Sequence, residues 1–274
     1  MKVKFWGVRG SVPVPGPTTV QVGGNTPCVE VTTVDREVLI LDAGTGIRLL
    51  GLDLAERRME RLVAVLLFSH THWDHIQGLP FFRPARSSAN RLVILGPRRL
   101  GKTLEQILAG QMVDAYLPFT FEELGADLII KEVHNEEPLV VGNHTTVMPR
   151  RLLHPGGAFG YRIGCQGKSV AYASDTSHPD QGLDPNVVEL ARGADLLIHD
   201  SHFTPEEKLE HPGWGHSSWR EAVEVAIQAG ARRLALFHHD PGRTDHQLKL
   251  IEAEARAIFP GSFVAREGMV VTLQ

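Results

Sequence analysis

Apolar positions follow two different periods along the chain, so the sequence predicts strands and helices interleaved from end to end. The N-terminal third holds short β-branched or aromatic runs bounded by Gly, Pro and Asp, which predict strands at 3–7, 28–34 and 37–41. Apolar residues then recur at helical spacing and predict a helix over 46–57. The seven-residue apolar run Leu62–Phe68 predicts a buried strand.

The remaining two thirds of the chain continue this alternation without any linker-like or low-complexity stretch. The pattern predicts strands at 92–95, 128–133, 139–141, 145–149, 159–164, 169–173, 195–199, 233–237 and 263–272, and helices at 99–109, 218–229 and 245–257. The stretch Ser218–Glu221 fits a capping box at the start of the second of these helices, and Gly230 ends that helix. We therefore predict one α+β domain over residues 1–274, with sheets sandwiched between helix layers.

The amino-acid composition limits which partners and which location the sequence predicts. The 274 residues are 42% hydrophobic and 22% charged, with a net charge of −4 and no basic run. A long nucleic acid would find no electrostatic footprint here, whereas a small or short phosphate substrate remains compatible. Two distant cysteines, no signal-peptide core and no apolar run long enough for a bilayer predict a cytoplasmic protein without a membrane partner. A homo-oligomer is compatible with the sequence.

The stretch S-H-T-H-W-D-H at 69–75 crowds three histidines and one aspartate behind the buried strand. These four residues, His70, His72, Asp74 and His75, are either solvated polar groups in a loop or ligands of a metal site. Alternate residues of an extended segment share a side, so His70 and His72 can converge, and the chain must turn near Asp74 to present His75. Neutral imidazole suits zinc, and a carboxylate suits a second ion or an oriented water, so the pattern favours a metal site.

Further metal ligands should come from other strand ends, where rigid backbone holds them. His154, Asp175 and His238 each follow a predicted strand or apolar run. His239 lies beside His238, and the register of the strand before them favours His238 as the ligand, with His239 behind it or at the surface.

With these partners the chain resembles the metallo-β-lactamase fold hydrolases, because H-T-H-W-D-H matches their H-x-H-x-D-H signature and the later His, Asp and His occur in the family's order. The resemblance covers essentially the whole chain and implies a four-layer αββα sandwich. It also implies two zinc ions, with manganese or iron in some members. His70, His72 and His154 would hold the first ion, Asp74, His75 and His238 the second, and Asp175 would bridge them.

Other stretches resemble the ribonuclease Z-like phosphodiesterase branch of that family. These are V-K-F-W-G-V-R-G-S, G-G-N-T-P-C and L-I-L-D-A-G-T-G near the N-terminus, and L-L-I-H-D-S-H-F and G-W-G-H-S-S near the C-terminus. The resemblance implies that Asp200, where a glutamate is usual, orients His216 and that His216 protonates the leaving group. His216 also precedes a predicted helix N-terminus, which favours anions. His199, next to Asp200, is equally compatible with a functional and a structural role.

Two departures from that branch affect the predicted substrate. Ribonuclease Z carries a long glycine-rich arm between the third histidine and the bridging aspartate, but His154 and Asp175 are only 21 positions apart and a hairpin fills the gap. The shorter side chain of Asp200 also reduces its reach toward His216. The sequence therefore predicts hydrolysis of a cyclic nucleotide or a small nucleic-acid-derived phosphodiester rather than transfer RNA processing. The alternatives are a lactone, thioester or β-lactam hydrolase on the same site, and a non-catalytic module that metal stabilises.

Several other features favour structural roles. D-A-G-T-G at 42–46 lacks the Lys-Ser/Thr ending of a phosphate loop, so a tight strand-to-helix turn is expected. The aromatic residues Phe5, Trp6 and Phe81–Phe82 can line a pocket for a base, but core packing is the expectation. The six histidines without shared spacing are expected at the surface; they are His134, His144, His178, His202, His211 and His246.

Overall fold

The computed structural model describes residues 1–57 and 60–274 and contains two seven-stranded sheets. The first sheet has the spatial order β14 (Val270–Thr272), β1 (Lys2–Gly7), β2 (Cys28–Thr32), β3 (Val38–Leu41), β4 (Val63–Leu67), β5 (Arg91–Gly96) and β6 (Asp127–Glu132). The second sheet has the order β13 (Ser262–Val264), β12 (Leu234–Phe237), β11 (Leu196–Asp200), β10 (Lys168–Ala173), β9 (Ala158–Cys165), β8 (Thr145–Leu152) and β7 (Leu139–Val141). Each sheet combines an antiparallel half with a parallel half.

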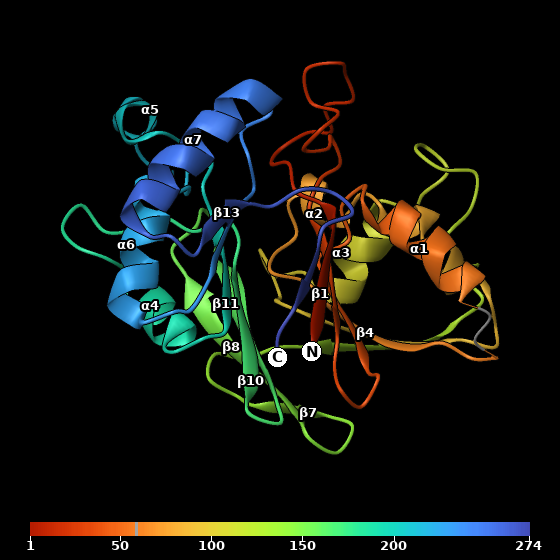
Figure 1. Cartoon of the computed structure of the whole chain (residues 1–274). Helices are drawn as coiled ribbons and strands as arrows, with labels where there is room; N and C mark the ends of the chain where they lie inside the picture. The colour runs from red at the N-terminus through yellow and green to blue at the C-terminus, as the bar shows by residue number, and fades with distance from the viewer. Residues whose placement is uncertain (58–59) are drawn as a thin grey trace.

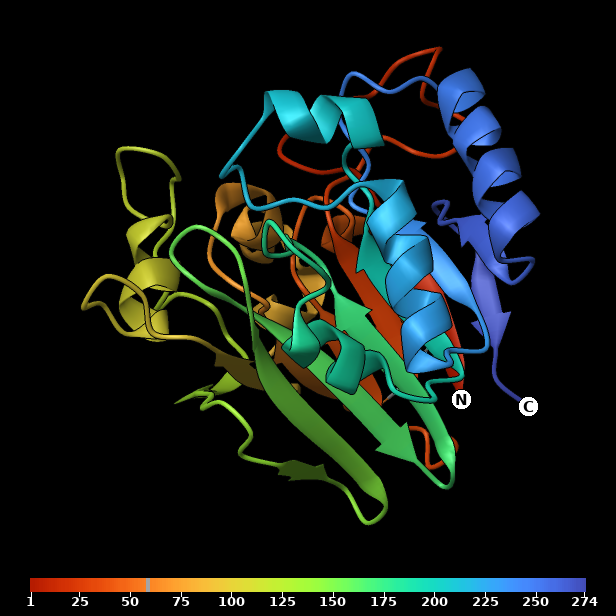
Figure 2. The same ribbon diagram turned by 90° about the vertical axis from the view of Figure 1, so that its left-hand side faces the viewer.

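Helices cover the outer face of each sheet (Figure 1), so the molecule has the four layers of an αββα sandwich. One side carries α1 (Ile47–Glu56), the short α2 (Trp73–Ile76) and α3 (Leu104–Gly110). The other side carries α4 (Pro185–Ala191), α6 (Trp219–Ala229) and α7 (Asp245–Ile258), with α5 (Pro205–Glu210) above them in Figure 2. The predicted fold class is therefore confirmed. Among the described residues no helix is both long and apolar enough to cross a membrane.

The alternation within the strands sorts side chains into two separate cores. In β3, Leu39 and Leu41 join the cluster between the sheets, whereas Ile40 joins the cluster beneath α1 and α3. Leu67 and Leu66 of β4 divide in the same way. Strands that are buried on both faces read as continuous apolar runs, and this explains the unbroken hydrophobic pattern at 62–68.

Helix ends agree closely with their local signals. Ser218 caps α6 by accepting from the Glu221 N–H in a full capping box, and Gly230 ends the helix in the left-handed conformation at φ 66°. The helix predicted at 99–109 begins later, at Leu104, because Thr103 forms its own capping box with Gln106 and residues 99–102 form a turn. The helices α4 and α5 were not predicted.

The prediction of one final strand over 263–272 is wrong. The chain forms β13 in the second sheet, turns at Gly268 with φ 78°, and then forms β14 in the first sheet. The last strand thus crosses between the sheets and pairs with β1, next to the N-terminus (Figure 1). The strand predicted at 145–149 continues to Leu152, since Pro149 does not interrupt its pairing with β9.

Candidate metal centre

The predicted ligands gather at one edge of the sandwich, where strands of both sheets end. His70 follows β4 of the first sheet, and Asp175 and His238 follow β10 and β12 of the second. His154 comes two residues after β8, and Asp200 is the last residue of β11. Because β10, β11 and β12 run parallel, their carboxyl ends meet at this edge, and the backbone of the sheet fixes the side chains there.

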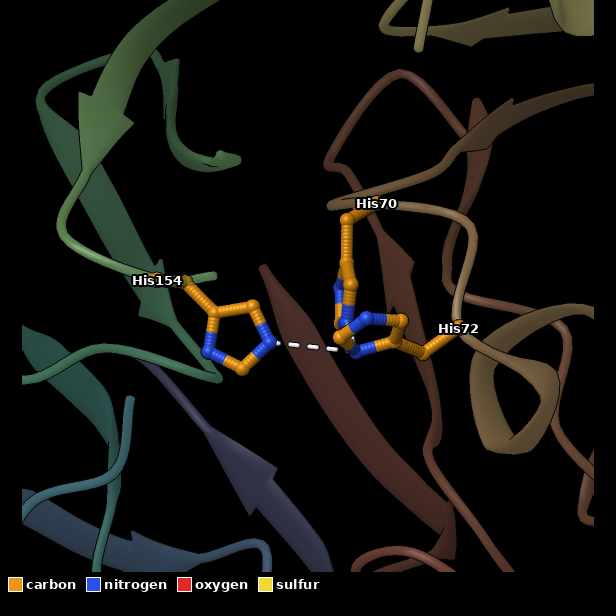
Figure 3. Close-up of side chains that lie close together, drawn as sticks. All are labelled: His70, His72 and His154. Carbon is orange, nitrogen blue, oxygen red and sulfur yellow. Dashed lines mark hydrogen bonds between the residues drawn. The ribbon is translucent and has the colours of Figure 1, made fainter. Parts of the chain in front are cut away.

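Three histidine nitrogens converge in the first group of predicted ligands (Figure 3). His72 Nδ1 lies 2.8 Å from His70 Nε2 and 3.1 Å from His154 Nε2. Zinc–nitrogen bonds of about 2.0–2.1 Å in a tetrahedral site place donors about 3.3 Å apart, so these distances suit one ion. Burial lowers the pKa of all three imidazoles, that of His72 to about 4, and the neutral form offers the lone pair that a metal needs.

A second group of donors lies beside the first. His75 Nε2 is 3.3 Å from Asp74 Oδ2, and His238 Nε2 is 3.2 Å from the same oxygen. The two imidazole nitrogens are 3.4 Å apart. These separations again match the donor spacing of a small divalent ion.

Asp175 lies between the two groups and turns one carboxylate oxygen to each. Its Oδ1 is 3.8 Å from His70 Nε2 and 3.9 Å from His154 Nε2. Its Oδ2 is 3.0 Å from His75 Nε2 and 3.2 Å from His238 Nε2. This is the arrangement of a carboxylate that can bridge two ions.

The charges of the second group support each other in the buried site. Burial alone would lower the pKa of His75, but the carboxylates of Asp175, Asp74 and Asp42 raise it well above its usual value. Burial also disfavours the charged carboxylates, yet the surrounding histidines hold the pKa of Asp74 and of Asp175 well below the usual range. Both carboxylates are therefore ionised, as ligands of a cation must be.

Hydrogen bonds outside the two groups select which nitrogen of each ring faces inward. His154 Nδ1 donates to the Gly215 carbonyl at 2.9 Å, and His75 Nδ1 donates to Asp42 Oδ2 at 2.8 Å, so in both rings Nε2 is the nitrogen that faces the other donors. The Ser11 N–H donates to Asp74 Oδ2 at 2.8 Å. His72 is turned the other way: its Nδ1 faces the nitrogens of His70 and His154, and its Nε2 lies 2.8 Å from Arg99 Nη2.

Asp42 is a supporting residue that the sequence reasoning missed. It is buried at the start of D-A-G-T-G, which was predicted only as a turn. Besides His75, its carboxylate accepts from the Ser69 N–H at 2.7 Å, the Ser69 hydroxyl at 2.8 Å and the Tyr172 hydroxyl at 2.7 Å. An aspartate directly after a buried strand was the available signal, but its partners are far away in the sequence.

Three residues of the centre adopt the left-handed backbone conformation that non-glycine residues rarely use. They are Asp42 (φ 59°), Asp175 (φ 53°) and His238 (φ 56°), and each lies one or two residues after a strand. Gly10 packs against the His238 ring so closely that a Cβ there would lie 2.5 Å from Cε1. The backbone is thus bent at the strand ends in a way that aims these side chains at the edge of the sandwich.

Asp200 and His216 form a hydrogen-bonded pair beside the metal ligands. Asp200 Oδ2 accepts from His216 Nδ1 at 2.8 Å, so the shorter aspartate does reach the histidine. Its Oδ1 accepts from the backbone N–H groups of His202 at 3.0 Å and Ser217 at 3.2 Å. Burial alone would lower the pKa of His216, but Asp200 raises it to about 9, and this pKa keeps the ring protonated at neutral pH. The ring stacks at 5.0 Å on His238.

The neighbouring histidines take structural positions. His239 turns away from the ligands, and its Nε2 donates to the Ala265 carbonyl at 3.1 Å. His199 is also buried, and it stacks on His178 rather than reaching the donor groups. The structure therefore brings His238, and not His239, to the centre.

The prediction that six histidines lie at the surface is wrong for His178 and His202. His178 is buried because it stacks on His199 and accepts from the Asp184 N–H at 3.1 Å. His202 is buried because it stacks at 4.4 Å on His216 and its Nδ1 donates to the His238 carbonyl at 3.1 Å. Its position two residues after Asp200 was the signal that could have identified it.

Comparisons with known proteins agree with this fold. A family model described as the beta-lactamase superfamily domain matches residues 36–239, and the chain belongs to that superfamily. The uncharacterized protein Rv1339 of Mycobacterium tuberculosis is 33% identical over 237 residues, which cover 81% of this chain and 76% of the relative.

One further relative and one solved structure are similar to this chain. Ribonuclease Z of Gemmatimonas aurantiaca is 27% identical over 329 residues, with 99% of this chain and 95% of the relative covered. The metallo-beta-lactamase fold protein YhfI of Bacillus subtilis superposes with a TM-score of 0.74 at 22% identity, covering 98% of each chain. The chain therefore belongs to the beta-lactamase superfamily, and its sequence is similar to that of ribonuclease Z within it.

Proposed function

We propose that this chain is a binuclear metal-dependent phosphodiesterase that hydrolyses a cyclic nucleotide or a small nucleic-acid-derived phosphodiester. The observation that carries the proposal is the Asp200–His216 pair, a histidine whose Nδ1 lies 2.8 Å from a buried carboxylate beside two groups of candidate metal donors. Alkoxide leaving groups of phosphodiesters need such an acid, whereas the leaving groups of thioesters do not.

Two zinc ions fit the donor atoms, and manganese or iron would use the same residues. His70, His72 and His154 would hold one ion, and Asp74, His75 and His238 the other, with Asp175 between them. Bound ions supply a water of low pKa and positive charge for the phosphate oxygens. The donor spacing of about 3 Å in each group supports this occupancy.

Residues of the chain orient the attacking water and protonate the leaving group. Asp74, whose Oδ2 is held by the Ser11 N–H at 2.8 Å, orients the attacking water. His216 uses Nδ1 to bind Asp200, so its Nε2 is the atom that donates a proton to the departing oxygen. The eleven-residue helix α6 begins three residues after His216, and the capping box of Ser218 and Glu221 fixes the start of this helix.

A small substrate fits better than transfer RNA. Between His154 and Asp175 the chain forms only β9, β10 and their connecting turn, with no arm that could hold a large RNA. The net charge of −4 also gives a long polyanion little attraction. We therefore expect no transfer RNA 3′ processing by this chain.

A substrate panel tests the proposal against its rivals. Protein loaded with zinc should hydrolyse bis-p-nitrophenyl phosphate and a cyclic nucleotide, and the activity should disappear with chelation and return with added metal. Faster turnover of a lactone or a thioester than of either phosphodiester would contradict the proposal and favour another hydrolase on the same site. Stoichiometric metal without any turnover would favour a module that metal only stabilises.

A further inference from the structure

We propose that an apolar cleft beside the metal centre binds the aromatic base of a nucleotide substrate, an inference that rests on the proposed phosphodiesterase function. The cleft has a volume of about 450 Å³ and lies between α2, α3 and the segment after α3. Thr71 and Trp73, the chain neighbours of His72, both line it. A nucleotide whose phosphate reaches the ligands around His72 can therefore extend its base into the cleft.

Exposed aromatic side chains are concentrated in this cleft. Trp73 is 70% exposed, Phe81 is 51% exposed and Tyr116 is 69% exposed, and all three line it. Only one other large aromatic side chain in the described part of the chain, Trp214, is as exposed. Three separate segments thus bring aromatic rings to one place, which is how proteins build stacking surfaces for bases.

The position of Phe81 corrects the expectation that the Phe81–Phe82 pair packs in the core. Phe82 is buried in the cluster beneath α1, but Phe81 faces the cleft. Gly78–Phe82 forms a short 3-10 turn, in which neighbouring side chains point in different directions. A side chain that the fold leaves in solvent next to a catalytic centre is available for a ligand.

Polar groups in the cleft suit the edge of a base. Gln106 and Gln111 line the cleft, and the buried Nε2 of Gln111 has no hydrogen-bond partner among the described residues. Amide side chains both donate and accept, so they match the mixed edge of a nucleobase. An unpartnered buried donor is costly, and a ligand acceptor would relieve it.

Positive charge marks the path from the cleft to the metal ligands. Lys102 lines the cleft, and the backbone N–H of Arg99 donates to its carbonyl at 3.2 Å. The Arg99 guanidinium reaches His72 and the Pro155 carbonyl, while its buried Nη1 has no partner within 1–57 and 60–274. These cations lie where a phosphate between the centre and the cleft would need them.

Two substrates with the same leaving group isolate the base. Thymidine 5′-(p-nitrophenyl phosphate) and methyl p-nitrophenyl phosphate both release p-nitrophenolate, but only the first carries a base. We expect Trp73→Ala and Phe81→Ala each to lower kcat/KM for the thymidine ester about 10-fold, with the methyl ester within about 2-fold of wild type. The control Leu250→Ala, which removes a 51% exposed side chain from α7, should change neither.

A binding measurement separates this inference from the proposed function. Calorimetry on the zinc-loaded chain should give at least about 10-fold tighter binding of AMP than of ribose 5-phosphate, and Trp73→Ala should remove most of that difference. If no phosphodiester is hydrolysed but this preference and its loss are observed, the proposed function fails and the base site stands. Equal binding of the two ligands by the wild type, or equal losses on both esters in the variants, would overturn the base site.

Discussion

Replacing Asp42 with asparagine tests how the fold orients His75 toward the metal centre. The carboxylate accepts four hydrogen bonds, two from Ser69, one from His75 Nδ1 and one from the Tyr172 hydroxyl, all at 2.7–2.8 Å. An asparagine oxygen can keep the bond from the Ser69 N–H, but its amide nitrogen would replace Oδ2. Hydroxyls can rotate and accept from that nitrogen, whereas the His75 Nδ1–H cannot when Nε2 serves as the metal ligand.

The expected loss follows from this count. A hydrogen bond to a charged group contributes about 1.5–3 kcal/mol, and a buried N–H left without an acceptor costs about 1–3 kcal/mol. Since the two hydroxyls recover part of this, we expect Asp42→Asn to lower the free energy of unfolding by about 2–4 kcal/mol. Losing the partner that orients a ligand should also weaken metal binding by about 10- to 100-fold.

Two measurements on the same variant check this reasoning. Urea unfolding of the metal-free protein gives the stability loss, and competition with a chelating dye gives the zinc affinity. Tyr172→Phe is the matched control, because it removes one hydrogen bond to Asp42 and leaves the bond from His75. It should cost about 1 kcal/mol and change zinc affinity little. Wild-type zinc affinity in Asp42→Asn would refute the proposed orienting role.

Four further substitutions test the metal ligands, the proton donor and the start of α6. His70→Ala should lose metal in elemental analysis and activity in turnover assays, while His239→Ala should keep its metal content. Metal loss in both variants would contradict the assignment of His70, and not His239, as a metal ligand. His216→Ala should keep its metal but lower turnover of substrates with poor leaving groups by about 100-fold or more, and unchanged turnover would mean that another group is the acid. The fourth substitution, at Glu221, tests how the stability of the fold depends on pH. Burial alone would raise the pKa of Glu221, but hydrogen bonds from Lys208 and from the backbone at the α6 N-terminus hold it below its usual range. Its contribution is present above the unfolded pKa of about 4.3 and is lost as the pH falls through the lower folded pKa. Glu221→Gln should therefore cost about 1 kcal/mol in urea unfolding at pH 7 and less at pH 4; an equal cost at both would exclude the ionic contribution.

Much of the fold could be predicted because its signals are local. The apolar run at 62–68, the capping box at Ser218 and the glycine at 230 each depend on neighbours within a few residues, and the corresponding elements formed as predicted. The division of the last segment into β13 and β14 could not be predicted in this way. It depends on pairing with β12 and β1, which no pattern within 263–272 encodes.

The candidate site likewise contains residues with local signals, which could be predicted, and residues that depend on distant contacts, which could not. The predicted ligands converge because four lie in the S-H-T-H-W-D-H motif and the other three lie one or two residues after a strand. Their role as ligands stays a prediction. Asp42 was missed because its partners Ser69 and Tyr172 lie 27 and 130 positions away. The aromatic cleft was missed because Trp73 and Tyr116 meet only after α3 packs beside α2.

The left-handed residues at the strand ends have a consequence for protein engineering. Asp175 and His238 occupy backbone positions that glycine or asparagine would adopt more easily, at a gain of about 1 kcal/mol each. A library selected only for survival at high temperature would therefore tend to replace the residues of the centre itself. Such a selection would yield more thermostable variants that no longer bind metal. Thermostability screens on this scaffold therefore need an activity assay at every round.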